Sequence, residues 1–188
     1  TIMKKETSEY ILKSNLKYSE DAVRNYIISY PMAPIRLVRK SLFKDYNFTE
    51  KILYEDLCLM PTLAIMTSKI SFLNEGLYYY VQRDSSIMTS AFNEKQLDIF
   101  KVLNNVKDKF IENDLYKKYE KEIEYLYITH LLRSASYRFI SVNNYKELLN
   151  RINLIFKKDY PNWHKNIYYK KSSFKLKLIC NLSYYRLY

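Results

Sequence analysis

The sequence predicts a mainly helical α+β fold that contains one short β-hairpin and ends in a helical extension. Three observations lead to this prediction. Hydrophobic residues make up 48% of the 188 residues, which is enough for a packed core. Apolar residues recur with helical spacing along most of the chain. The β-prone stretches are confined to residues 69–73 and 77–82, and Asn74-Glu75-Gly76 between them favours a turn.

Short helices and turns are expected to alternate through residues 1–90. Ser19-Glu20-Asp21 is typical of a helix cap followed by an acidic first turn, so a helix should run to about residue 30 and stop before Pro31. The run at 56–67 is apolar nearly all round, which predicts a well-buried helix. The other expected elements are short helices at 8–16 and 39–43 and an extended segment at 32–38.

The pattern changes near residue 91, where we place a boundary between residues 1–90 and a helical extension at 91–188. Helical spacing with charged faces marks the ranges 94–112, 114–140 and 145–157, and a Lys/Tyr/Leu-rich helix should begin near Ser172. The second of these ranges carries an apolar stripe of Leu115, Tyr119, Ile123, Leu126, Ile128, Leu131 and Leu132.

The glycine content excludes two common kinds of nucleotide site. Gly76 is the single glycine of the chain. The P-loop and the dinucleotide-binding fingerprint both need several glycines, because the backbone must approach phosphate closely and adopt left-handed turns. The chain therefore binds no nucleotide by either route.

Positive charge is concentrated at the end of the chain. The formal net charge is +11, and residues 157–188 contain eight Lys or Arg against one acid, Asp159. Three interpretations remain: a solvated helical face with core contacts, peripheral binding to an anionic membrane, and nucleic-acid binding. We expect no nucleic acid, since no recognised binding motif occurs. The aromatic and apolar residues that alternate with the cations there are Tyr168, Tyr169, Phe174, Leu178, Ile179, Leu182, Tyr184 and Tyr185.

Cysteine usage and apolar runs favour a cytoplasmic protein, with the inner face of the membrane as a further location. Cys58 and Cys180 are far apart and lack metal-binding spacing, which favours free thiols in a reducing compartment. No apolar run is long enough for a transmembrane helix, and no signal peptide is recognised. Because the chain starts at Thr1 rather than at a methionine, we expect it to be part of a longer protein.

Glu55-Asp56 is the strongest candidate for chemistry. A carboxylate at a helix N-terminus is kept ionised by the helix dipole and can accept a proton from a substrate hydroxyl. Taken on its own, the dipeptide is better explained by ordinary helix capping. Neither His130 nor His164 can be joined to other residues in a catalytic arrangement, so a structural role is expected for both.

The surrounding sequence resembles the second half of the catalytic domain of family-2 glycosyltransferases, which have the A-type fold. The resemblance covers roughly residues 32–90 and, weakly, the tail around Pro161-Asn162-Trp163-His164-Lys165-Asn166. The matching segments are, in order, Pro34-Ile35-Arg36-Leu37-Val38-Arg39-Lys40-Ser41-Leu42-Phe43, Tyr46-Asn47-Phe48-Thr49-Glu50, Tyr54-Glu55-Asp56, Ile70-Ser71-Phe72-Leu73 and Leu77-Tyr78-Tyr79-Tyr80-Val81-Gln82-Arg83-Asp84-Ser85-Ser86-Ile87.

This resemblance implies roles for particular residues. Asp56 would be the general base, with Glu55 as its companion. Arg83, Ser85 and Ser86 would lie near the donor diphosphate, where an arginine can neutralise the leaving group. Arg36 stands near the position of a family lysine and would contact substrate. The tryptophan of that family segment is absent, with Ile35 near its place.

The resemblance also implies what the chain lacks. No Asp-x-Asp motif occurs, although the family uses that motif to hold Mg or Mn against the sugar diphosphate. The fragment itself should therefore carry no cofactor, and the nucleotide-binding half should precede residue 1. The expected partners are a nucleotide-sugar donor and a glycan or lipid-linked acceptor, such as a growing bacterial surface glycan. The fragment alone should be inactive, and its exposed docking face could form a homodimer.

The competing hypothesis is a non-enzymatic helical module with a basic face. Such a module would bind a membrane surface or a partner protein in a salt-sensitive manner, and changing Asp56 would not affect its function.

Overall fold

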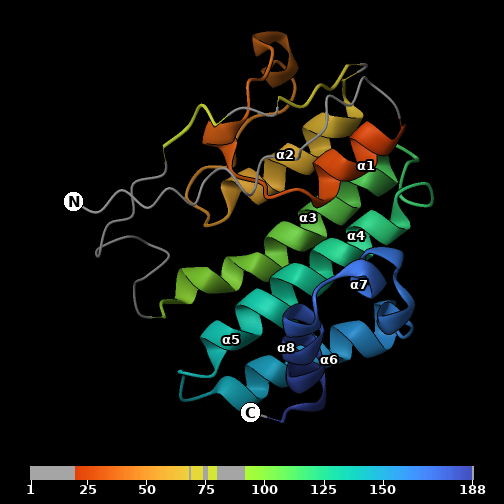
Figure 1. Ribbon diagram of the computed structural model, residues 1–188. Coiled ribbons are helices and arrows are strands. Elements are labelled where there is room, and N and C mark those ends of the chain that lie inside the picture. Colours follow the sequence, from red (N-terminus) through yellow and green to blue (C-terminus); the bar gives the residue numbers. More distant parts are fainter. Residues whose placement is uncertain (1–19, 68, 74–75, 80–91, 188) are drawn as a thin grey trace. The chain divides into compact units, whose positions relative to one another are not determined.

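The computed structural model describes residues 20–67, 69–73, 76–79 and 92–187 (Figure 1). The chain folds as two compact units. Unit 1 takes in the residues up to Lys51 together with the segment that begins at Glu55 and ends at Ala91. Unit 2 contains Ile52–Tyr54 and everything from Phe92 onward. The three residues before Glu55 therefore belong to the unit formed mainly by the second half of the chain.

Unit 1 is organised around two packed helices, α1 (Glu20–Ile28) and α2 (Glu55–Ile65). Both begin with acidic residues, as the sequence predicts, because negative charge is stabilised at a helix N-terminus. Two short 3₁₀ helices, η2 (Ala33–Ile35) and η3 (Lys40–Phe43), lie between them along the chain. Residues 32–38, predicted to be extended, therefore contain one tight turn.

Helix α2 supplies most of the core of unit 1. Its apolar residues surround the helix, so seven of its eleven residues are buried. Pro61 lies inside the helix, where it removes one backbone donor, and it is buried with its neighbours. The core cluster consists of Leu59, Met60 and Leu63, against which Tyr26, Ala33, Val38, Leu42, Phe43 and Tyr46 pack.

The predicted α+β class is wrong for the part of the chain that the structure describes, because every regular element there is a helix. Residues 69–73 and 76–79 form no strand, so the hairpin and the A-type fold portion are not supported. The side chains of Leu73, Leu77 and Tyr79 are 54%, 71% and 76% exposed. A two-stranded ribbon is marginal without a third strand or a helix on its apolar face. High β-propensity alone therefore did not produce a sheet.

Unit 2 opens with η4 (Glu94–Leu97) and α3 (Asp98–Glu112). The latter is strongly amphipathic: its buried side chains recur every three to four residues, as the spacing in the sequence predicts. These buried residues are Ile99, Phe100, Val102, Leu103, Val106 and Phe110.

The predicted helix at 114–140 is realised as three consecutive segments. They are α4 (Glu120–Tyr127), the π-helix η5 (Ile128–Ala135) and α5 (Ser136–Phe139). The backbone N–H of Ser136 bonds to the carbonyl of Leu131, five residues back, which is the wider spacing of a π-helix. Most of the predicted apolar stripe is buried along these segments.

The remaining helices of unit 2 are α6 (Tyr145–Asp159), η6 (Trp163–Lys165), α7 (Ile167–Lys171) and α8 (Phe174–Tyr185). Helix α8 packs on η5 and α6, and α7 packs on α4 (Figure 1). Small side chains allow the approach of α8 to η5: the hydroxyls of Ser136 and Ser183 lie 2.5 Å apart, and each donates to the carbonyl of Leu132 or to the other.

The turn between α6 and α7 is fixed by Trp163 and Asn166, which are 2% and 1% exposed. The Trp163 ring packs on Phe156, Tyr169 and Tyr184. The oxygen of the Asn166 side chain accepts from the backbone of Tyr168 and Tyr169, so it caps α7. Its amide nitrogen donates to the carbonyl of Lys121 and to Glu124 Oε2, at 2.8 Å each. The full hydrogen-bonding capacity of this buried side chain is therefore used within the protein.

Candidate functional site

The predicted carboxylate pair occupies the first turn of α2. Glu55 is exposed to solvent, whereas Asp56 is half-buried. The Asp56 Oδ1 atom accepts a hydrogen bond from the backbone N–H of Leu57 at 2.7 Å. The two neighbours thus have different surroundings, which is the arrangement that lets one carboxylate act on a proton while the other remains solvated.

The pKa of Asp56 is raised above its ordinary value of 3.8. Burial is the largest cause, because it disfavours the charged form, and the negative charge of Glu55 adds to it. The bond from Leu57 and the positive charge of Arg36 act in the opposite direction. A carboxylate with a raised pKa is a stronger base, so Asp56 is better suited than an ordinary exposed aspartate to remove a proton from a hydroxyl.

Arg36 belongs to the same unit, and its charge reaches Asp56. Its Nη2 atom donates to Ser29 Oγ at 2.8 Å and to the carbonyl of Tyr30 at 2.6 Å, just beyond the end of α1. The guanidinium lies 4.0 Å from the centre of the Tyr26 ring, close enough for a cation–π contact. These contacts hold Arg36 in place and give it a structural role at the end of α1. Its contact with substrate stays a prediction.

The other predicted substrate residues, Arg83, Ser85 and Ser86, lie outside the described residues. The structure therefore brings together Glu55, Asp56 and Arg36 within unit 1, and their functional roles remain predictions.

Tyr54 directly precedes the carboxylate pair in the sequence. The sequence pattern gave it no role beyond its place in the segment Tyr54-Glu55-Asp56. Tyr54 belongs to unit 2 and adopts a φ of 67°, in the left-handed region that is costly for a residue with a bulky side chain. Arg138 Nη1 donates to its hydroxyl at 2.9 Å, and Asp98 Oδ2 accepts from the backbone N–H of Leu53 at 2.9 Å. No periodicity in the sequence signals these contacts, because the partners are far apart along the chain.

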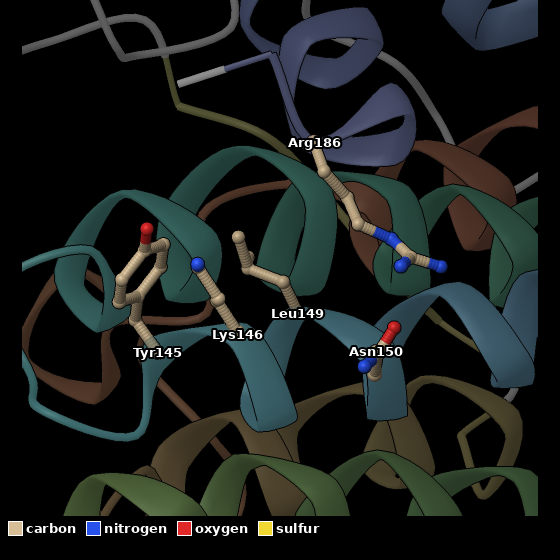
Figure 2. A pocket seen from close by; sticks show the side chains of 5 residues that line it. All are labelled: Tyr145, Lys146, Leu149, Asn150 and Arg186. Carbon is tan, nitrogen blue, oxygen red and sulfur yellow. The ribbon is translucent and has the colours of Figure 1, made fainter.

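Among the described residues of unit 2, two pockets stand out, and neither is lined by the carboxylate pair. The first is a cavity of about 210 Å³ between the start of α6 and the residue after α8 (Figure 2). Figure 2 shows Arg186 opposite Asn150, with Lys146 and Tyr145 on the other side of Leu149. The cavity combines two cationic side chains with an amide, and no acidic residue lines it.

The second pocket has a different chemistry. It measures about 170 Å³, and its lining residues are Tyr116, Glu120, Lys121, Glu124, Asp159, Tyr160, Pro161 and Asn162. Its carboxylates are engaged: Lys121 pairs with Glu120 and Glu124, and Lys107 pairs with Asp159 at 3.1 Å. We therefore regard it as a surface hollow held by ion pairs.

The two histidines occupy different environments. Burial, together with the charges of Arg133 and Arg138, lowers the pKa of His130 to about 4, so the ring is neutral at physiological pH. His164 is exposed and stacks edge-on against Trp163. No catalytic partner contacts either ring among the interactions of the described chain.

The Mg or Mn expected for the intact enzyme does not fit the residues that the structure describes. No group of three or more His, Cys, Asp or Glu side chains there could hold a metal ion. No step of the reaction is therefore assigned to a metal held by this part of the chain. Among the described helices, none has the length and apolar content needed to cross a membrane.

Comparison with known proteins gives one relevant similarity. The chain is 26% identical, over 136 residues, to a protein named glycosyltransferase GlyG from Streptococcus pneumoniae serotype 4. The match covers 64% of this chain and 41% of the relative, so the chain spans less than half of that protein's length. No protein-family model matches the chain, and no solved structure gives a significant match. The similarity supports the glycosyltransferase part of the predicted resemblance, while membership of family 2 stays a prediction.

Proposed function

We propose that the chain is part of a glycosyltransferase that moves a sugar from a nucleotide-sugar donor to a glycan or lipid-linked acceptor, in the manner of family 2. The observation that carries this proposal is the similarity to glycosyltransferase GlyG. The environment of Asp56 supports it independently, because partial burial raises the pKa of this carboxyl group and makes it a stronger base than an ordinary exposed aspartate.

In the proposed reaction, Asp56 accepts the proton of an acceptor hydroxyl. The freed oxygen attacks the anomeric carbon of the donor sugar, and the bond between that carbon and the diphosphate oxygen breaks. The nucleoside diphosphate leaves with the electron pair of that bond, and the configuration at the sugar is inverted. The negative charge of Glu55 beside Asp56 helps to keep the proton affinity of Asp56 high.

The donor is proposed to bind mainly outside the described residues. The single glycine excludes a phosphate-cradling loop of the known types here, and the relative is more than twice as long as the matched part. We propose that a nucleotide-binding part, with its Mg or Mn, completes the enzyme, so that the chain alone is inactive. Arg83, Ser85 and Ser86 are proposed to face the donor diphosphate.

The test is nucleoside diphosphate release by the full-length protein with a panel of nucleotide sugars and Mg or Mn. Asp56→Asn is compared with wild type, because asparagine keeps the acceptor for Leu57 but cannot take the proton. We expect release to fall at least about a hundredfold, the range for losing a general base. Glu55→Gln is the matched neighbour and should lose far less. Equal release by wild type and Asp56→Asn would remove Asp56 from the mechanism.

A further inference from the structure

Helix α8 has two apolar faces, and only one of them is covered. On the inner face Cys180 and Ser183 are 0% and 2% exposed, and Ser183 bonds to Leu132 of η5. On the outer side Phe174, Leu178 and Tyr185 are 81%, 47% and 63% exposed. An apolar face on both sides of a surface helix indicates that something outside the unit covers the second.

The exposed apolar residues form a line that Asn181 interrupts between Leu178 and Tyr185. They stand at positions i, i+4 and i+11 of the helix, and three turns of an α-helix take about eleven residues, so they lie on one side. Leu187, 66% exposed, is the second residue after the helix, beyond Arg186. We call Phe174, Leu178, Tyr185 and Leu187 the α8 stripe.

Cations accompany the α8 stripe, and acids do not. Lys170, Lys171 and Lys175 are exposed around the start of α8, and Arg186 follows its end. Residues 160–188 contain no Asp or Glu. The ion pairs found among the described residues of unit 2 involve Lys107, Lys109 and Lys121 instead. The surface beside the stripe therefore carries a net positive charge that no carboxylate of this segment neutralises.

The cationic cavity adjoins the end of the stripe. Arg186 follows Tyr185 in sequence and lines the cavity of about 210 Å³ together with Lys146 and Asn150 (Figure 2). Two cations and an amide donor at an open cavity are suited to a phosphoryl group, which is anionic and accepts several hydrogen bonds. The cavity can thus take a headgroup phosphate next to apolar side chains.

We propose that the α8 stripe and the cavity at Arg186 form a docking surface for an anionic phospholipid membrane. The apolar side chains enter the boundary between headgroups and acyl chains, and the flanking cations bind the lipid phosphates. Charge complementarity selects this occupant, since a second copy of the chain would place like charges opposite each other at the surface. The inference stands apart from the transferase chemistry, because it uses no residue of α2.

The experiment is vesicle co-sedimentation of the full-length protein. Vesicles contain phosphatidylcholine alone or phosphatidylcholine with phosphatidylglycerol. We expect binding to the anionic vesicles only, weakened by high salt. Lys171→Gln with Lys175→Gln should lower the partition coefficient about fivefold for each lysine removed. Lys146→Gln with Arg186→Gln should lower it by a similar factor, and Leu178→Ser by about tenfold.

Matched controls come from elsewhere in unit 2. Ile111 is 49% exposed on α3, nearly the same as Leu178, so Ile111→Ser should leave binding unchanged. Lys101→Gln with Lys117→Gln is the control for charge, and circular dichroism verifies that each variant folds. The proposal would be overturned if Leu178→Ser left vesicle binding unchanged, or if the protein bound equally to both kinds of vesicle. So would a dimer, measured by analytical ultracentrifugation, that Leu178→Ser dissociates while vesicle binding stays the same.

Discussion

Arg138 donates a hydrogen bond to the hydroxyl of Tyr54 across 84 positions of sequence, at 2.9 Å. With the bond from Leu53 to Asp98, it fixes the segment that directly precedes Glu55 onto the helices of unit 2. The left-handed backbone of Tyr54 is held against its local preference by these contacts. The residue two positions before the proposed base is therefore anchored by the helical extension.

Tyr54→Phe should weaken this anchor while keeping the ring. We expect the free energy of unfolding to fall by about 1 kcal/mol, because Arg138 loses a partner in a half-buried place. If the anchor positions Asp56, kcat for sugar transfer falls while KM for the donor stays near its wild-type value. Denaturant titration and initial rates measure the two effects. Tyr137→Phe is the control, since that side chain is 71% exposed, and a loss of kcat there of the same size would argue against positioning by Tyr54.

Asp56→Asn should make the protein slightly more stable at neutral pH. The pKa of Asp56 is raised in the folded state, so the folded chain binds that proton more tightly than the unfolded chain does, and ionisation costs stability above this pKa. Asparagine removes that cost. The difference between variant and wild type should shrink as pH falls through the raised pKa, which thermal unfolding at several pH values can measure. A less stable Asp56→Asn at neutral pH would contradict this account.

The pH dependence of the proposed transferase activity should also report the ionisation of Asp56. A base works only when deprotonated, so the rate should fall toward acid pH with a midpoint above that of an ordinary aspartate. The pH profile of kcat/KM measures that midpoint. Arg36→Gln removes a charge that lowers the pKa of Asp56, so the midpoint should move further up, and a downward shift would count against the assignment.

Asn166→Ala should be strongly destabilising. It removes the cap of α7 and leaves the Lys121 carbonyl and the Glu124 carboxylate without their amide donor, at an expected cost of about 2–4 kcal/mol. Asn166→Asp keeps the capping oxygen but places a second carboxylate beside Glu124, so it should cost at least as much at neutral pH. Asn162→Ala, at an exposed position, should change little. Chemical denaturation compares the three variants.

His130 should make unit 2 sensitive to acid. Its folded-state pKa of about 4 lies below the ordinary 6.5, so the unfolded chain takes up the proton first. The stability that the neutral ring contributes is complete above about pH 6.5 and is lost as pH falls toward 4. His130→Gln should flatten this part of the stability profile, which chemical denaturation at several pH values can measure.

The sequence predicted the helices well where apolar spacing and caps agree. The acidic starts of α1 and α2 and the buried face of α3 follow from local preferences and from the need to cover apolar side chains. The hairpin at 69–82 was predicted from composition and a turn signal alone. Strand pairing depends on partners elsewhere in the fold, which a single sequence does not reveal.

The candidate site shows the same division. The position of Asp56 at the start of a helix could be predicted, because Glu-Asp before an apolar run is a local signal. Its partial burial and the contacts of Arg36 with Ser29, Tyr30 and Tyr26 could not, since they depend on how α1 packs against α2. The hydrogen bond from Arg138 to Tyr54 could not be predicted either, because it also depends on how distant segments pack.

The π-helix at Ile128–Ala135 has a consequence for how this chain can tolerate insertions and deletions. A π-turn holds about one residue more than an α-turn, so it behaves like an insertion that the helix has absorbed without a loop. Deleting one residue there, for example Ser134 on the exposed side, would turn a π-turn into an α-turn and leave the residues that follow on the helix faces they occupy now. Arg138 would then still face Tyr54, and Ser136 would still face Ser183. This segment of unit 2 can therefore lose one residue without a change in the register of the helix that follows it.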